Sequence, residues 1–290
     1  MVSKERLTEV VVELFRRAVI QPPVDVVRAL QDAYRNETSE IARTQLKAIL
    51  DNIKLARKKE VPVCQDTGIP LFYVTVGSNI SVDVNDIHEA VVEGVAKATK
   101  TIPLRPNVVD PVSRKNSGNN IADGMPHIDF TFLPEKDYVE ITVLPKGAGS
   151  ENMSALAMLK PSEGVKGVKK FVLETVARAS GNPCPPTIIG VGLGGSSDLA
   201  LALAKKALLR PIGTKNRDRT LAALEVELKE KINQLGVGPM GLGGRATCLA
   251  VQVEKAGCHT ASLPVGINMQ CWTGRRAAAR VFKNKVEWLK

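Results

Sequence analysis

Three of the five cysteines lie in segments that read as turns, and they are the first candidates for chemistry. Cys64 lies in Val61-Pro-Val-Cys-Gln-Asp-Thr-Gly68, Cys184 in Asn-Pro-Cys-Pro-Pro, and Cys271 in Asn-Met-Gln-Cys-Trp-Thr-Gly. Turns are poor places for core residues, and the prolines around Cys184 fix the backbone and leave few amide donors to compete for its sulfur. These positions suit thiolates that bind a metal. The spacing alone does not prove that the three cysteines meet.

The other two cysteines, Cys248 and Cys258, lie in more apolar, regular segments and are interpreted as core residues. Without a C-x-x-C pair in the sequence, a zinc ribbon is unsupported. The odd cysteine count and the charged N-terminal segment, which reads as an amphipathic helix rather than a secretory signal, make disulfides unexpected. No apolar run approaches the length of a membrane helix. We expect a cytoplasmic protein, or an organellar one whose targeting peptide has been removed.

A glycine motif offers a competing chemistry. Gly190-Val-Gly-Leu-Gly-Gly195 fits G-x-G-x-x-G between a short strand and a helix, which is the context of a dinucleotide fold. No strand that ends in an acidic residue follows at the expected distance, and the basic segment Arg210–Arg219 comes next instead. We therefore favour a close backbone approach at these glycines. A nicotinamide-dependent dehydrogenase is the less favoured alternative.

The elements that must position these residues follow from hydrophobic periodicity. Helical spacing covers residues 3–57, with a break at Pro22–Pro23. Residues 61–145 read as strands and one helix, and the last two strands are expected to form a hairpin through a turn at Pro134–Asp137. The predicted elements of this segment are a strand at Phe72–Val76, a helix at Ile87–Ala98, and strands at Ile128–Leu133 and Tyr138–Leu144.

The second half of the chain alternates helices with a strand and glycine-rich turns. Its predicted elements are helices at Val165–Ala179, Asp198–Leu209 and Leu221–Leu235, a strand at Thr187–Val191, and a closing basic helix at Trp272–Val286. We predict a mixed α/β (α+β) protein that forms one domain over residues 1–290. A helical section, residues 1–57, precedes the sheet, and the candidate site lies in loops.

The charge balance limits the kinds of binding partner that can be expected. The chain has 40 Lys and Arg against 30 Asp and Glu, a formal net charge of +10. This excess could serve nucleic-acid binding, attraction of an anionic substrate, or a solvated surface beside an oppositely charged partner. The basic residues are scattered, aromatic residues make up 4% of the chain, and no nucleic-acid-binding motif is present. We expect neither a nucleic acid nor a membrane as partner.

Four segments together resemble class I fumarate hydratases and their close relatives, the L-tartrate dehydratases. They cover nearly the whole chain in the family's order: 61–68, Lys146-Gly-Ala-Gly-Ser-Glu-Asn152, 190–195, and the stretch from Gly238-Pro-Met-Gly-Leu-Gly-Gly244 through His259-Thr-Ala-Ser-Leu-Pro264 to Cys271. Single-chain members continue into a second domain after this region. The sequence therefore resembles the alpha subunit of the two-chain form.

The resemblance implies a [4Fe–4S] cluster held by Cys64, Cys184 and Cys271. One iron is then left without a protein ligand, so it can act as a Lewis acid toward the substrate. It also implies a set of substrate-binding residues, of which Asp66 and His259 are the catalytic candidates and Arg105 is a carboxylate clamp. The full set is Gln65, Asp66, Arg105, Gly147 and His259.

The implied reaction is the reversible hydration of fumarate to L-malate, with L-tartrate dehydration as the alternative. The resemblance places the catalytic base in a separately encoded beta subunit, expected in an α2β2 assembly. A non-catalytic cluster-binding or nucleic-acid-binding protein is the rival from another class. No residue in the sequence discriminates between the two dicarboxylate substrates.

Overall fold

The computed structural model describes residues 1–289, which form two compact units. The first unit contains Met1–Pro23, Asn52–Gly147 and the chain from Arg275 onward. The second unit contains Val24–Asp51 and Ala148–Gly274. Each unit has its own sheet and its own hydrophobic core. The single domain expected from the sequence stays a prediction.

The N-terminal section is helical, as predicted. Helix α1 spans Lys4–Ile20, α2 spans Val24–Asn36 and α3 spans Glu40–Lys59, with Pro22 and Pro23 between the first two. Ser3 caps α1 by accepting a hydrogen bond from the amide of Arg6, which satisfies one of the amides left open at a helix start. Within residues 1–289, no helix is long and apolar enough to cross a membrane.

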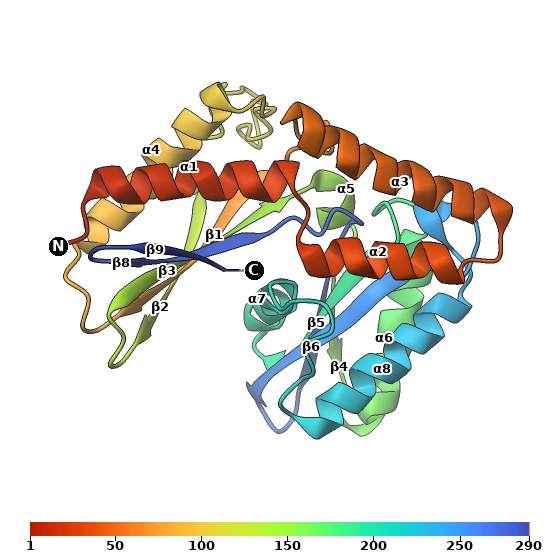
Figure 1. The fold of residues 1–290 in the computed structure, drawn as a ribbon. Helices are drawn as coiled ribbons and strands as arrows, with labels where there is room; N and C mark the ends of the chain where they lie inside the picture. The colour runs from red at the N-terminus through yellow and green to blue at the C-terminus, as the bar shows by residue number, and fades with distance from the viewer. Residues whose placement is uncertain (290) are drawn as a thin grey trace. The chain divides into compact units, whose positions relative to one another are not determined.

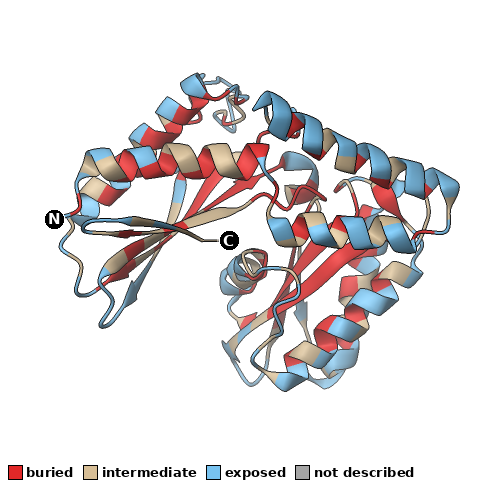
Figure 2. Ribbon diagram, in the orientation of Figure 1, coloured by how far each residue is buried: buried red, intermediate tan, exposed pale blue. Residues whose placement is uncertain are grey.

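The first unit contains a five-stranded sheet in the order β2-β1-β3-β8-β9 (Figure 1). Helices α1 and α4 (Val84–Thr101) pack on each other, and α1 also packs on β3 and β8. Buried residues lie on the strands and on the helix faces turned toward them (Figure 2). The strands are β1 (Ile69–Gly77), β2 (His127–Leu133), β3 (Tyr138–Lys146), β8 (Ala277–Phe282) and β9 (Val286–Leu289).

The hairpin predicted for the second and third strands is wrong, although both strands exist. β1 lies between them, pairing parallel with β2 and antiparallel with β3. The turn instead passes over the end of β1, where Asn79 donates to the main-chain oxygen of Lys136 at 2.8 Å. A Cβ atom on Gly77 would lie 2.6 Å from the carbonyl carbon of Lys136, so the crossing requires glycine there. β1 is mostly buried and lies between β2 and β3.

The prediction of a closing basic helix at Trp272–Val286 is also wrong, because this segment contains strand β8 and the first residue of strand β9. Ala277, Ala279 and Val281 pair with residues of β3, and the last two are fully buried. At the neighbouring position, Nε of Arg280 donates a hydrogen bond to the Glu140 carboxylate of β3 at 2.8 Å. The alanines favour a helix in isolation, but burial against β3 outweighs that preference.

The second unit contains a four-stranded sheet in the order β4-β7-β5-β6. Helix α7 packs against one face, and α6 and α8 pack against the other. Alternate residues of β5 point to opposite faces of the sheet, and Ile189 and Val191 lie in the core on the face covered by α6 and α8. The elements are α5 (Ala148–Glu151), β4 (Ala155–Leu159), α6 (Gly164–Ala179), β5 (Thr187–Gly195), α7 (Ser197–Ala207), α8 (Arg219–Gln234), β6 (Cys248–Cys258) and β7 (Leu263–Gln270), with 3-10 turns at Pro161–Glu163 and Pro239–Gly241. The α+β class predicted from the sequence is confirmed.

The glycine motif belongs to this packing. Gly190 and Gly192 lie on the face of β5 that meets α7, and a Cβ on either would collide with main-chain atoms of Ala204 or Ala200. The helix backbone therefore rests directly on the strand. These glycines are explained by a close helix–strand contact, which is the favoured interpretation of the motif.

Replacing Gly192 with alanine is expected to destabilise the second unit. The added methyl would lie 2.7 Å from the amide nitrogen of Ala204, and rigid backbone cannot give way cheaply. Overpacking of this kind costs ~2 kcal/mol, which corresponds to a melting temperature lower by about 5 °C for a chain of this size. Calorimetry checks this against Gly257→Ala, where a Cβ meets nothing within 4 Å. Equal melting temperatures for the two variants would contradict the packing argument.

Candidate functional site

The loop before β1 brings several predicted site residues together in the first unit. Cys64, Gln65 and Arg105 line one open cavity of about 580 Å³, whose other walls are Pro62, Thr67, Pro103 and Leu104. The thiol, the amide and the guanidinium come from two segments, 62–67 and 103–105. A cation and an amide donor beside a free thiol suit an anionic ligand near a metal.

Thr67 joins these two segments. Its hydroxyl accepts a hydrogen bond from the amide of Arg105 at 3.1 Å and donates to the Arg105 carbonyl at 3.3 Å. Thr67 is buried, whereas Arg105 is exposed. The main chain of Arg105 is therefore fixed while its guanidinium remains accessible in the cavity.

Asp66 is held by its own loop. Its Oδ1 accepts hydrogen bonds from the amide of Gly68 at 2.9 Å and from Nδ2 of Asn107 at 3.2 Å. Asn107 also donates to the carbonyl of Gly68 at 3.3 Å. The carboxylate therefore has a fixed orientation, which a group that contacts substrate requires.

Gly147 and Arg275 lie against Asp66. A Cβ atom on Gly147 would be 2.8 Å from Nη2 of Arg275 and 3.1 Å from Oδ2 of Asp66. Arg275 donates from Nη1 to the main-chain oxygen of Asp66. The sequence did not single out Arg275 as a site residue, because Arg275–Arg276 reads as a solvated or partner-facing pair. The available signals were its position four residues after Cys271 and the glycine at 147.

The second unit brings Cys184 and Cys271 to one end of its sheet. Cys184 precedes β5, Cys271 follows the antiparallel β7, and the amide of Trp272 donates to the Cys184 carbonyl at 3.2 Å. The sulfur of Cys271 lies 2.9 Å from the Thr273 hydroxyl oxygen. Cys184 has a φ of +55°, which is uncommon for a residue with a side chain and typical of functional sites. Both cysteines are half-exposed free thiols.

His259 lies at the opposite end of β7. It is exposed in the connection between β6 and β7, where its Nδ1 accepts a hydrogen bond from the amide of Ala261 at 3.1 Å. The eight residues of β7 separate it from Cys271, which corresponds to about 25 Å along an extended strand. The structure therefore does not bring His259 beside Cys184 or Cys271 within this unit.

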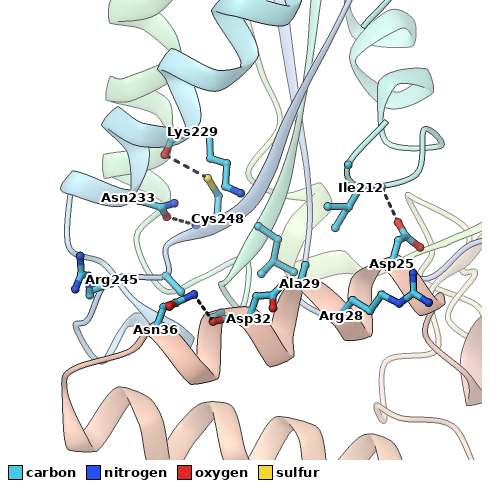
Figure 3. A pocket seen from close by; sticks show the side chains of 14 residues that line it. Asp25, Arg28, Ala29, Asp32, Asn36, Ile212, Lys229, Asn233, Arg245 and Cys248 are labelled. Carbon is cyan, nitrogen blue, oxygen red and sulfur yellow. Dashed lines mark hydrogen bonds between the residues drawn. The ribbon is translucent and has the colours of Figure 1, made fainter. Parts of the chain in front are cut away.

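The remaining cysteines differ from each other. Cys248 is buried as predicted, and this burial raises the pKa of its thiol to about 12. It lines a cavity of about 580 Å³ between α2 and α8, together with Lys229 and Asn233 (Figure 3). None of the predicted site residues lines this cavity. The core interpretation of Cys258 is wrong, because this residue is exposed at the end of β6.

Among residues 1–289, no three His, Cys, Asp or Glu side chains are grouped to hold one metal ion. The ligands of a cubane cluster bind different irons and lie farther apart than the ligands of one ion. Cys64 of the first unit and Cys184 and Cys271 of the second unit all lie in loops, and the main chains of Cys184 and Trp272 are hydrogen-bonded.

Comparison with known proteins gives consistent results. The family described as "Fumarate hydratase (Fumerase)" matches residues 8–280. A Methanocaldococcus jannaschii protein, provisionally named L(+)-tartrate dehydratase subunit alpha, is 56% identical over 95% of this chain and 98% of its own length. The L(+)-tartrate dehydratase subunit alpha of Escherichia coli (strain UTI89 / UPEC) is 36% identical over 95% of this chain and 91% of its own.

Proposed function

The chain belongs to the fumarate hydratase (Fumerase) family, and on that premise we propose that it is the cluster-binding alpha subunit of a dicarboxylate hydro-lyase. The observation that carries the proposal is the grouping of Cys64, Gln65 and Arg105 around one cavity, with Asp66 fixed beside it. The five free thiols also fit a reducing compartment such as the cytoplasm.

The proposed cofactor is a [4Fe–4S] cluster held by Cys64, Cys184 and Cys271. When bound, it supplies a Lewis acid, an iron without a protein ligand, for the oxygen that leaves or adds. The fit rests on the donor set, since all three residues are free thiols outside helices and strands. Cys248 is not proposed as a ligand, because its side chain is buried in the core of the second unit, where its sulfur lies against the Lys229 carbonyl.

The chain's own residues bind and orient the substrate. The exposed guanidinium of Arg105 can donate two parallel hydrogen bonds to a carboxylate, and Gln65 can donate a third from the same cavity. Asp66 can accept a hydrogen bond from the substrate hydroxyl while its loop keeps it in place. Gly147 is proposed as a main-chain contact. His259 is the least supported member of the set because of its place at the far end of β7.

Asp66→Asn is expected to lower kcat for fumarate hydration about a hundredfold, because the amide keeps the shape of the carboxylate but loses its charge. Iron content per chain should match that of the unmodified protein, since Asp66 is not a proposed ligand. The matched control is Asp110→Asn, on an exposed loop, where kcat should not change. If Asp66→Asn keeps full activity with a full cluster, Asp66 has no role in the reaction.

The test of the function is a substrate assay on the anaerobically reconstituted protein together with its beta subunit. Hydration of fumarate, measured as loss of its ultraviolet absorbance, is the expected result. L-tartrate is the second candidate, favoured by the names of the relatives in M. jannaschii and E. coli. L-malate, the hydration product of fumarate, differs from L-tartrate by one hydroxyl group, so fumarate and L-tartrate are assayed at equal concentration. Turnover of neither acid would refute the proposed function.

A further inference from the structure

The side chain of Arg275 is the largest among those that are fully buried, with 1% of its surface exposed. A guanidinium cannot lose its charge in a protein, so its burial is costly unless specific partners surround it. A buried arginine in this position therefore needs a reason. Arg105, by contrast, lies exposed in the cavity and is available to a ligand.

The contacts of Arg275 point to the loop that carries Cys64, Gln65 and Asp66. Its Nη1 donates to the main-chain oxygen of Asp66. Its Nη2 occupies the space where Gly147 would otherwise carry a side chain, 2.8 Å from the position of a Cβ atom. Glycine at 147 thus makes room for the guanidinium, a requirement separate from any contact of its main chain with substrate.

The same loop is also fixed at Gly68, independently of Arg275. A Cβ on Gly68 would lie 2.7 Å from the amide nitrogen of Lys146, so this glycine packs directly on the end of β3. The amide of Gly68 in turn holds Oδ1 of Asp66. The end of the loop rests on a strand, whereas the carbonyl of Asp66, in the middle of the loop, is bound by Arg275. Removing that contact would release the segment that contains Cys64 and Gln65.

We propose that Arg275 is a positioning residue, which holds the Cys64–Asp66 segment in its working geometry and which Gly147 accommodates by lacking a side chain. The inference rests on the proposed function for its effect on turnover, but its structural part does not. Arg275 touches the main chain of Asp66, so its influence on the reaction passes through the loop. A misplacement of about 1 Å in such a loop costs about a hundredfold in rate.

Hydrogen exchange of the full chain tests the structural part. Arg275→Ala is expected to raise amide exchange in peptides covering residues 61–70 about tenfold, while peptides from β5 keep their protection. Arg280→Ala is the matched control, because this arginine of β8 pairs with Glu140 at a partly exposed position and should leave the loop unchanged. Unchanged exchange in the loop of a folded Arg275→Ala variant overturns the proposal.

Kinetics of the reconstituted complex test the functional part. For Arg275→Ala we expect kcat to fall about a hundredfold and KM to change less than about threefold, because a group that acts in the transition state is misplaced. Arg275→Lys keeps the positive charge but loses the planar set of guanidinium donors. Its kcat should exceed that of Arg275→Ala by no more than about tenfold. A variant with full kcat refutes the positioning role.

Gly147→Ala gives a second route if Arg275→Ala does not fold. The methyl should displace the guanidinium and loosen the same loop peptides. Gly147→Ala should raise the exchange rate of the loop less when it is introduced into the Arg275→Ala variant than when it is introduced into the unmodified chain. The reason is that the guanidinium it would displace is already absent. Fully additive effects contradict the pairing. If the unmodified complex hydrates no dicarboxylate, the proposed function fails, and the exchange results still decide the role of Arg275.

Discussion

Replacing Cys64, Cys184 or Cys271 with serine is expected to leave the chain without a stable iron–sulfur cluster. Each residue supplies one of only three proposed ligands, and a serine oxygen is a poorer ligand for iron than a thiolate. Iron bound per chain after anaerobic reconstitution should fall from about four toward zero, as expected for [4Fe–4S] ligation by cysteine. The broad visible absorbance of the cluster should disappear with it.

The controls for this prediction are the other two cysteines, which the structure separates by burial. Cys258→Ala changes an exposed thiol and should retain full iron. Cys248→Ser places a hydroxyl in a fully buried position beside the Lys229 carbonyl, so it tests stability as well as iron content. Loss of iron in Cys258→Ala together with full iron in Cys271→Ser would overturn the ligand assignment.

Local patterns predicted most of the fold. Helices such as α4 and α8 have apolar residues at helical spacing, and capping residues Asp83 and Asp218 sit at their starts. Strands β4, β6 and β7 of the second sheet were not predicted, and the two wrong predictions both concern strand partners. The order β2-β1-β3 depends on a crossing that Gly77 permits, and the strand at Ala277–Phe282 depends on pairing with β3. Neither interaction is local in sequence, so periodicity could not reveal it.

The grouping of the candidate residues was predictable where neighbours in a sequence motif are also neighbours in space. Cys64, Gln65 and Asp66 are consecutive. Thr67, the next residue, accepts a hydrogen bond from the amide of Arg105, and Arg105 lines the same cavity as Cys64 and Gln65. Arg275 was not predictable, because nothing in the Arg275–Arg276 pair distinguishes a buried guanidinium from a solvated one. The position of His259 was not predictable either, since the length and direction of β7 decide on which end of the sheet it lies.

The cavity of the first unit contains only part of what a dicarboxylate requires. Of the residues that line it within the described chain, Arg105 is the one with a positive charge. Arg275 is close in sequence to a proposed ligand, but it is buried and its guanidinium is bound to the main chain of Asp66. A dicarboxylate has two anionic ends, and holding both of them fixes the reacting carbons. A second cationic group from outside this cavity is therefore expected.

This chain alone is therefore expected to be inactive even when its cluster is complete, and to gain activity only with a separately encoded beta subunit. Without the second carboxylate clamp and the catalytic base, turnover should be at least about a thousandfold lower than in the complex. The measurement is steady-state fumarate hydration by the reconstituted chain, with iron content determined in the same sample, before and after addition of the purified partner. Size-exclusion chromatography with light scattering on the active mixture tests the α2β2 assembly. Turnover by the chain alone within tenfold of the complex would mean that all groups needed for catalysis lie in this polypeptide.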